Sequence, residues 1–261
     1  MKCLSLLSLL TLVSCVPSTG GKLVSFNATA SGPDDAVKGQ PYVFTTPEGY
    51  QVTLSSAELF IGAVYLNQNN PANYQVEPAC ILPGIYSGEL RTSLWVDALN
   101  PEPQPFLQKG HGTDSPTLAA ELWLSSGDVQ SESADDVIFK ARGTARRGAD
   151  EWPFSVAFSI GPNRRLPPRD PALPGTNPLC KQRIISPIAA PLTLSEGGTL
   201  QLRLQPKRWF EAVDFAQLKE AQKSEGVYQF KDSASEAGQP DLALYNGLRT
   251  NRGPYVFDFT P

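Results

Sequence analysis

Leu200-Gln-Leu-Arg-Leu204 alternates apolar and polar side chains at every position, and the same period returns in Ser155-Val-Ala-Phe-Ser-Ile160 and Val24-Ser-Phe-Asn-Ala28. In an extended chain successive side chains point to opposite faces, so this period is typical of half-buried β-strands. Helical patterns are few, and they begin at Asp214 and Asp241. Further strands are expected at 51–55, 57–66, 85–91, 119–125, 136–146 and 255–259.

Many short strands separated by turns predict an all-β fold, an antiparallel β-sandwich of plain or jelly-roll type with one or two short helices. Turns are frequent because the 261 residues include 21 glycines and 24 prolines. Glu196-Gly-Gly198 is expected to be the turn of a hairpin between the segments ending at Leu194 and beginning at Leu200. Residues 23–261 are expected to form a single domain, because sandwiches extend to about 250 residues as one unit.

The overall charge argues against one class of partner. The chain has a formal net charge of −4 and an isoelectric point near 5.1. A general nucleic-acid binder needs a basic surface that displaces counterions from phosphates. No nucleic-acid partner is therefore expected.

The N-terminal segment has the features of an export signal. Lys2 precedes an apolar run from Cys3 to Val13, which is shorter than the roughly 20 residues needed to span a bilayer. Leu12-Val-Ser-Cys15 at its end resembles the lipobox of bacterial lipoproteins. The alternative is an ordinary secretory signal with an incidental cysteine.

The lipobox resemblance implies a set of modifications. Residues 1–14 form the signal peptide, Cys15 carries the diacylglyceryl and acyl groups (palmitate among them), and residues 15–22 form the lipidated N-terminus and a flexible linker. The membrane is then a partner through the lipid anchor, and the protein is located in the cell envelope. Val16 in place of an aspartate resembles the pattern sorted to the outer membrane.

Two cysteines remain once Cys3 and Cys15 are assigned to the signal segment and the anchor. Cys80 and Cys180 are expected to form a disulfide bond, because exported proteins fold in an oxidising setting. Closing a loop of about 100 residues stabilises a fold by up to about 4.7 kcal/mol in the chain-entropy model. The alternative is two separate buried thiols.

The content of metal-binding and nucleophilic residues is sparse. His111 is the sole histidine, and the sequence contains no Cys-x-x-Cys, His-Glu-x-x-His or Gly-x-Ser-x-Gly motif. His111, Asp114 and Glu121 could together offer ligands to zinc or calcium. The alternative is a solvated loop histidine. No cofactor is expected.

Three carboxylates lie in or beside apolar strand segments, namely Glu58, Asp97 and Glu121. A pair of carboxylates flanking a sugar is the minimum for glycoside hydrolysis, whereas carboxylates that point outward from strands are common. Trp95 and Trp123 are candidates for stacking on sugar rings, with core packing as the alternative. No residue is assigned a catalytic role.

Basic residues concentrate in residues 140–183, which hold nine Lys or Arg and three Asp or Glu. Within this segment the proline-rich stretch Gly161–Asn177 carries Arg164, Arg165 and Arg169. These three arginines are candidate binding residues for an anionic envelope glycan, a lipid headgroup or an acidic protein. The alternative is a set of solvated faces neutralised by neighbouring carboxylates.

Residues 23–261 are similar to lipoproteins that myxobacteria and related bacteria encode in many copies. The similarity rests on Ala57–Leu66, Pro171–Ile184 and Leu244–Arg249, and it implies neither an activity nor a ligand. The sequence favours a lipid-anchored envelope protein with a binding or scaffolding β-sandwich. An anchored glycan-acting or metal-dependent enzyme is the alternative, and convergence of the candidate carboxylates on one pocket would favour it.

Overall fold

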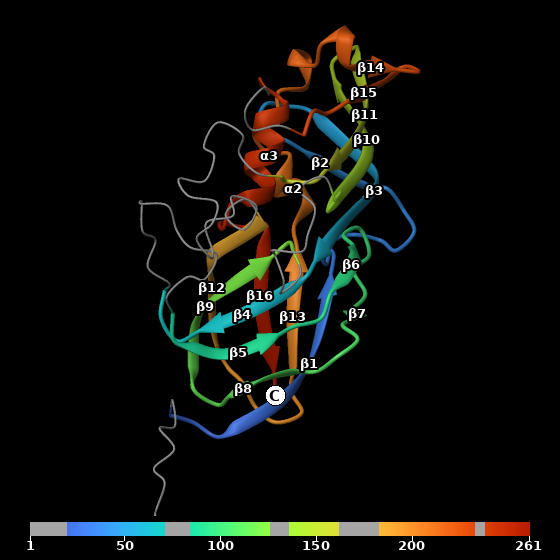
Figure 1. Cartoon of the computed structure of the whole chain (residues 1–261). Coiled ribbons are helices and arrows are strands. Elements are labelled where there is room, and N and C mark those ends of the chain that lie inside the picture. Colours follow the sequence, from blue (N-terminus) through green and yellow to red (C-terminus); the bar gives the residue numbers. More distant parts are fainter. Residues whose placement is uncertain (1–19, 71–83, 126–135, 162–182, 233–237) are drawn as a thin grey trace, which may run out of the picture.

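The computed structural model describes residues 20–70, 84–125, 136–161, 183–232 and 238–261. Within these ranges the chain folds into two β-sheets that pack together, accompanied by two short α-helices (Figure 1). The predicted all-β fold with one or two short helices is thereby confirmed.

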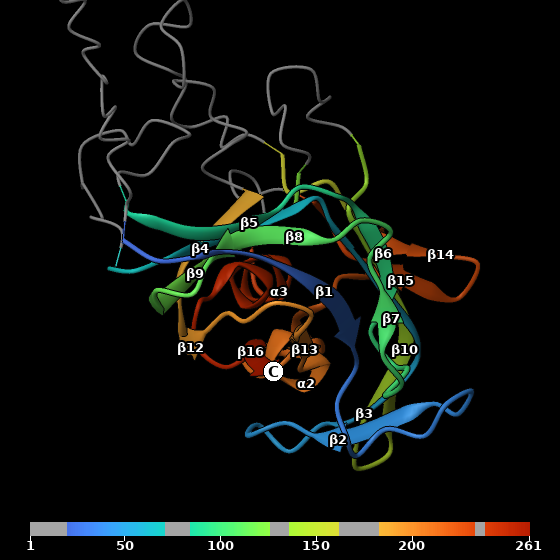
Figure 2. The same ribbon diagram turned by 90° about the horizontal axis from the view of Figure 1, so that it is seen from below.

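The larger sheet has nine strands in the order β12-β9-β4-β5-β8-β1-β13-β16, and β7 pairs with β1 beside this path. The sheet curls so that its two outer strands, β12 and β16, approach one another (Figure 2). The bounds are β1 Leu23–Ser31, β4 Ala63–Asn67, β5 Tyr86–Leu90, β7 Gln104–Pro105, β8 Gly110–Thr113, β9 Pro116–Trp123, β12 Ile184–Thr193, β13 Thr199–Leu204 and β16 Tyr255–Thr260.

The smaller sheet has seven strands in the order β14-β15-β11-β10-β3-β2, with β6 paired to β3. The bounds are β2 Tyr42–Thr45, β3 Gln51–Ile61, β6 Leu94–Asp97, β10 Phe139–Arg147, β11 Asp150–Phe158, β14 Lys223–Ser224 and β15 Val227–Gln229. Most neighbours in both sheets are antiparallel, whereas β1 with β13 and β11 with β15 are parallel pairs.

The hairpin predicted around Glu196-Gly-Gly198 is wrong. Strand β12 pairs with β9, while β13 pairs in parallel with β1 and antiparallel with β16. Gly197 does form a turn, with φ of 78°. The strand that follows it, β13, lies near the opposite end of the strand order from β12. An alternating pattern identifies the buried face of a strand without identifying its partner.

The strand predicted at 57–66 is divided between the two sheets. β3 ends at Ile61 in the smaller sheet, and β4 begins at Ala63 in the larger one. Gly62 is the junction, and its N–H donates to the carbonyl oxygen of Trp123 at 2.8 Å. One continuous apolar run therefore crosses from sheet to sheet.

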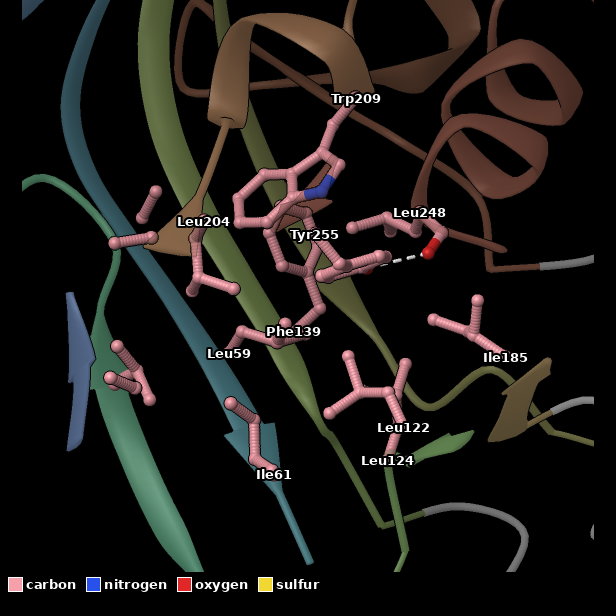
Figure 3. Close-up of a cluster of buried hydrophobic side chains, with 14 of the residues drawn as sticks. Leu59, Ile61, Leu122, Leu124, Phe139, Ile185, Leu204, Trp209, Leu248 and Tyr255 are labelled. Atoms are coloured by element: carbon pink, nitrogen blue, oxygen red, sulfur yellow. Dashed lines mark hydrogen bonds between the residues drawn. The ribbon is translucent and has the colours of Figure 1, made fainter. Parts of the chain in front are cut away.

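The core lies between the two sheets and beneath the helices (Figure 3). Helices α2, Pro206–Trp209, and α3, Asp241–Arg249, lie at one end of the curled sheet (Figure 1). Trp209 is fully buried and meets Phe139 edge-on, with ring centroids 5.2 Å apart. The Tyr255 hydroxyl donates to the Leu248 carbonyl at 2.6 Å, which joins the last strand to α3.

The two expected helices differ in outcome. The segment after Asp214 contains only the 3₁₀ turns Phe215–Gln217 and Glu220–Gln222, and the Asp214 carboxylate accepts from the Tyr50 hydroxyl instead of capping a helix. Asp241 is the first residue of α3, and its side chain accepts from the backbone N–H of Lys231 at 2.8 Å.

Several predictions concern residues outside the described ranges. These are the lipobox with Cys15, the pair Cys80 and Cys180, and the arginines Arg164, Arg165 and Arg169. Among the described helices none is long and apolar enough to cross a membrane.

Candidate functional site

The outer face of the larger sheet carries an unusual set of side chains. Tyr65 on β4 lies opposite Glu89 on β5 and Glu121 on β9, and Glu89 lies opposite His111 on β8. Cross-strand partners share one face of a sheet. The residues next to them in sequence, among them Val64, Leu66, Leu90, Ala120 and Leu122, are buried in the core on the other face. The four named side chains therefore belong to the outer face.

A pocket of about 520 Å³ opens over these strands. β4, β5, β8 and β9, which contribute most of its walls, lie side by side in the curled sheet (Figure 2). We call it the aromatic pocket. Its lining includes Leu23, Tyr65, Tyr86, Glu89, His111 and Trp123.

Three aromatic rings from three strands define this pocket. Tyr65 is central, with its ring centroid 4.9 Å from that of Trp123 and 5.6 Å from that of Tyr86. The interplanar angles of 53° and 63° show that neither pair is stacked face to face. The Tyr65 ring plane is thus inclined to both of its neighbours, which is an arrangement suited to surrounding a ligand group.

Glu121 is fully buried although it is on the outer face. Its carboxylate accepts from the Asn67 side-chain amide and from the Trp123 indole N–H, each at 3.1 Å. Burial raises the pKa of Glu121, and these two hydrogen bonds oppose the rise. Among the described residues, no Lys, Arg or His forms an ion pair with Glu121.

Glu121 also acts on the phenols of the pocket. Burial raises the pKa of Tyr86 to about 12, and the negative charge of Glu121 adds to the effect. Burial likewise raises the pKa of Tyr65, with the positive charge of Arg91 opposing and those of Glu89 and Glu121 reinforcing the rise. Both phenols therefore remain protonated at neutral pH, and the Glu121 carboxylate lies close enough to sense both.

Two glycines let β5 and β8 approach one another under the pocket. Gly88 and Gly112 are paired in register. A Cβ on Gly112 would lie 2.4 Å from the Ser87 carbonyl oxygen and 2.6 Å from a methyl of Leu194. Backbone cannot yield to such a contact, so the strand pair that presents Glu89 and His111 depends on these glycines.

The three metal-ligand candidates do not form a common site. His111 lines the aromatic pocket, and its Nδ1 lies 3.3 Å from the Ser25 hydroxyl. Glu121 is beneath Trp123, while the Asp114 carboxylate accepts from the backbone N–H of Lys22 at 2.7 Å. In the described part of the chain no group of three His, Cys, Asp or Glu could hold a metal ion.

The carboxylates considered for glycoside hydrolysis are divided between the sheets. Glu58 and Asp97 lie opposite one another on β3 and β6, exposed on the outer face of the smaller sheet. Glu121 lies on β9 of the larger sheet. The structure therefore brings one pair together but leaves the third member apart.

The two candidate tryptophans both lie outside the main core. Trp95 is 41% exposed, where it contacts Phe60 and lies beneath the Lys140 ammonium at 4.9 Å. Trp123 is buried in a small second cluster with Ala63. Core packing, the expected alternative for both, is wrong for Trp95.

Of the five described basic residues in this segment, four lie on β10, and the fifth, Arg183, lies apart from them in the sequence. Arg183 is fully buried and donates to the carbonyl oxygens of Ser159 and Asp136, each at 2.9 Å. Arg146 pairs with Glu151 at 2.9 Å. Arg146 with Glu151 is an exposed, neutralised pair of the kind that the alternative predicts, whereas the buried Arg183 is not.

Sequence reasoning missed Tyr65 and Tyr86 entirely. The available signal lay in the alternation along β4. Tyr65 and Asn67 occupy the positions between Val64 and Leu66, which face the core, and so belong to the opposite face of the sheet. An aromatic residue on the face opposite the core is a sign of either a partner or a pocket. The break at Gly62 concealed that alternation within one long apolar run.

Comparisons with known proteins assign no family. No protein-family model and no curated protein sequence matches the chain. Among solved structures, MbnP from Methylosinus trichosporium matches at 8% sequence identity with a TM-score of 0.39, over 93% of this chain and 100% of that one.

Proposed function

We propose that this chain is a lipid-anchored cell-envelope protein whose β domain binds a small ligand in the aromatic pocket. The observation that carries the proposal is the pocket itself, which three aromatic rings line on the outer face of a sheet, with the buried Glu121 hydrogen-bonded to one of them, Trp123. Outer faces of sheets are ordinarily polar and solvated. Aromatic walls with few polar groups are typical of small-molecule sites.

The arrangement of charged groups supports binding over catalysis. Hydrolysis of a glycoside needs two carboxylates on either side of one bond. The described Glu58 and Asp97 face solvent on the smaller sheet, whereas Glu121 is buried on the larger sheet, where it accepts from the indole N–H of Trp123. The pocket thus holds the elements of recognition, and the paired carboxylates lie elsewhere.

The proposed anchor would hold the pocket near a bilayer. Leu23, which lines the pocket, is eight positions after Cys15 in the sequence. At about 3.5 Å per extended residue the linker reaches at most about 28 Å. Each buried methylene of the lipid contributes about 0.8 kcal/mol, so a multiply acylated cysteine would not leave the membrane.

The pocket is tested by nuclear magnetic resonance on the full chain in a non-ionic detergent. The probes are fragment mixtures of three chemical classes: alkylammonium compounds, carboxylates and neutral sugars. The indole N–H signal of Trp123, identified by its loss in Trp123→Phe, should shift saturably with at least one class. If no fragment shifts it at millimolar concentration, the pocket is not a ligand site.

The other tryptophans supply the internal control. Trp95 is exposed on the other sheet and Trp209 is buried beneath the helices. Their indole signals should stay in place while that of Trp123 moves. A uniform shift of all signals would indicate a general solvent effect and would count against the pocket.

The anchor is tested separately. Cys15→Ser should abolish metabolic labelling with palmitate and move the protein out of the membrane fraction. Labelling that persists in the variant would contradict the lipoprotein proposal without affecting the pocket.

A further inference from the structure

We infer that the aromatic pocket takes a methylated ammonium group, as found in choline and related cations. The inference rests on the proposed function, since it names the chemical class of ligand for the same pocket. It is drawn from the three rings, from the carboxylates Glu89 and Glu121, and from the absence of a Lys or Arg among the described residues that line the pocket.

The rings supply the first part of the recognition. A cation is attracted to the face of an aromatic ring within about 6 Å of its centroid, and clusters of such rings bind quaternary ammonium groups. The Tyr65 ring centroid lies 4.9 Å from that of Trp123 and 5.6 Å from that of Tyr86, and the Tyr65 ring is coplanar with neither. Several ring faces are therefore available to one small group.

The carboxylates supply the second part. Glu89 is exposed and lines the pocket, while Glu121 is fully buried and accepts from the Trp123 indole N–H. Neither forms an ion pair with a basic side chain among the described residues. A buried carboxylate without a cation is costly to ionise. A ligand that brings positive charge would offset that cost.

A second buried acceptor belongs to the same network. The Asn67 amide nitrogen donates to Glu121, and its carbonyl oxygen is buried with no hydrogen-bond partner among the described residues. Turning the amide over would place that oxygen against the Glu121 carboxylate, which is why this orientation holds. The region around Glu121 is therefore rich in acceptors, and negative potential accumulates there.

No Lys or Arg is among the described residues that line the pocket. Arg91 acts on Tyr65, but it is exposed at the end of β5 and is not part of the lining. His111 lines the pocket and lies beside the Ser25 hydroxyl. Glu89 therefore lines the pocket together with the three rings, and the buried Glu121 adds negative charge that acts on Tyr65 and Tyr86.

A neutral ligand of the same shape would lack the attraction of a positive charge to the ring faces and to the carboxylates. A methylated ammonium is large and weakly hydrated, so aromatic walls replace its water at little cost, and charge then favours it over a carbon analogue. Choline and its neutral isostere 3,3-dimethylbutan-1-ol differ only in the central nitrogen or carbon. They form a matched pair for measuring the preference.

Calorimetry of the full chain in non-ionic detergent tests the inference. Choline should bind at least about tenfold more tightly than 3,3-dimethylbutan-1-ol. Glu121→Gln keeps the shape of the side chain, and the Asn67 amide can turn to match it, so this variant should fold and lose about tenfold in choline affinity. Tyr86→Leu, at a partly exposed ring, should lose a similar factor.

Matched controls lie on the other sheet. Glu58→Gln and Trp95→Leu alter an exposed carboxylate and an exposed tryptophan far from the pocket, and neither should change choline affinity. Equal affinity for choline and its isostere would overturn the cation inference. If fragments of another class still shift the Trp123 signal, the proposed function survives that result, and if none does, both fail.

The same ammonium group occurs free and on lipid headgroups, and vesicles distinguish the two sources. The Cys15→Ser chain, which lacks the proposed anchor, is mixed with phosphatidylcholine or phosphatidylglycerol vesicles. Capture by phosphatidylcholine alone, released by free choline, supports a headgroup ligand. Choline binding without vesicle capture supports a soluble ligand.

Discussion

Glu121 is the residue on which the chemistry of the pocket depends. It is a fully buried carboxylate that two donors, Asn67 and Trp123, hold in place. Because Trp123 donates its indole N–H to Glu121, the carboxylate also fixes the orientation of that ring. A substitution of Glu121 would therefore change both the charge beside the pocket and the orientation of the Trp123 ring.

The first prediction concerns the pH dependence of stability. Burial raises the pKa of Glu121 in the folded state, so its contribution is fully present below the ordinary glutamate pKa of about 4.3 and is lost as pH rises through the folded value. Glu121→Gln does not titrate. The free energy of unfolding of the variant, relative to wild type, should therefore rise between pH 4 and pH 7 in urea titrations.

A flat difference across that range would show that Glu121 has no raised pKa. Glu58→Gln is the control, because Glu58 is exposed on β3. Its difference from wild type should be small at each pH.

The second prediction concerns a hydrogen bond far from the pocket. The buried Tyr50 donates its hydroxyl proton to Asp214, and its oxygen accepts from the Ala216 N–H at 3.1 Å. Tyr50→Phe keeps the ring contacts and removes both bonds. The free energy of unfolding should fall by about 1–3 kcal/mol at pH 7.

The Tyr50 hydrogen bond is also the largest cause of the lowered pKa of Asp214. Stability from a lowered carboxylate pKa is present above the ordinary aspartate value of about 3.9 and is lost as pH falls. The penalty of Tyr50→Phe should therefore shrink between pH 7 and pH 3.5. A penalty that stays constant would contradict the assignment of this pair.

At the scale of elements, β5 and β8 position the pocket by their close approach. The third prediction is that Gly112→Ala destabilises the fold, because its Cβ would lie 2.4 Å from the Ser87 carbonyl oxygen. Overpacking of this kind costs about 1–3 kcal/mol. Gly238→Ala is the matched control, since nothing lies within 4 Å of its added Cβ.

Thermal unfolding of the two variants checks the comparison. The melting temperature of Gly112→Ala should fall by several degrees, while that of Gly238→Ala should stay close to wild type. Equal melting temperatures would show that the approach of β5 and β8 is not constrained as described.

The individual strands could be predicted from sequence because the alternation was local. Val24, Phe26 and Ala28 are buried as their period indicates, as are Leu200, Leu202 and Leu204. The ends of elements were less predictable. The apolar run through Gly62 gave no sign that β3 and β4 belong to different sheets, since both sheets bury the same kinds of residue.

At the scale of the molecule, strand pairing could not be predicted from a local pattern. The parallel pairing of β1 with β13 joins Ala28 to Leu200, which are far apart in sequence. Non-local pairings of this kind are selected by the packing of the entire core. The aromatic pocket is inaccessible to sequence reasoning for the same reason, because β4, β5, β8 and β9 meet only in the folded sheet.

The fourth prediction concerns the covalent framework of the whole chain. Cys80 and Cys180 are the cysteines that remain after the proposed signal segment and anchor. Peptide mapping without reducing agent should recover them linked to each other. Two free thiols in the unfolded mature protein would contradict this pairing.

The central claim is that the aromatic pocket binds a methylated ammonium group, and nuclear Overhauser contacts test it most directly. With choline bound to the full chain, its methyl protons should give contacts to the ring protons of Tyr65, Tyr86 and Trp123. Contacts to Trp95 in their place, or no contacts at saturating choline, would contradict the account.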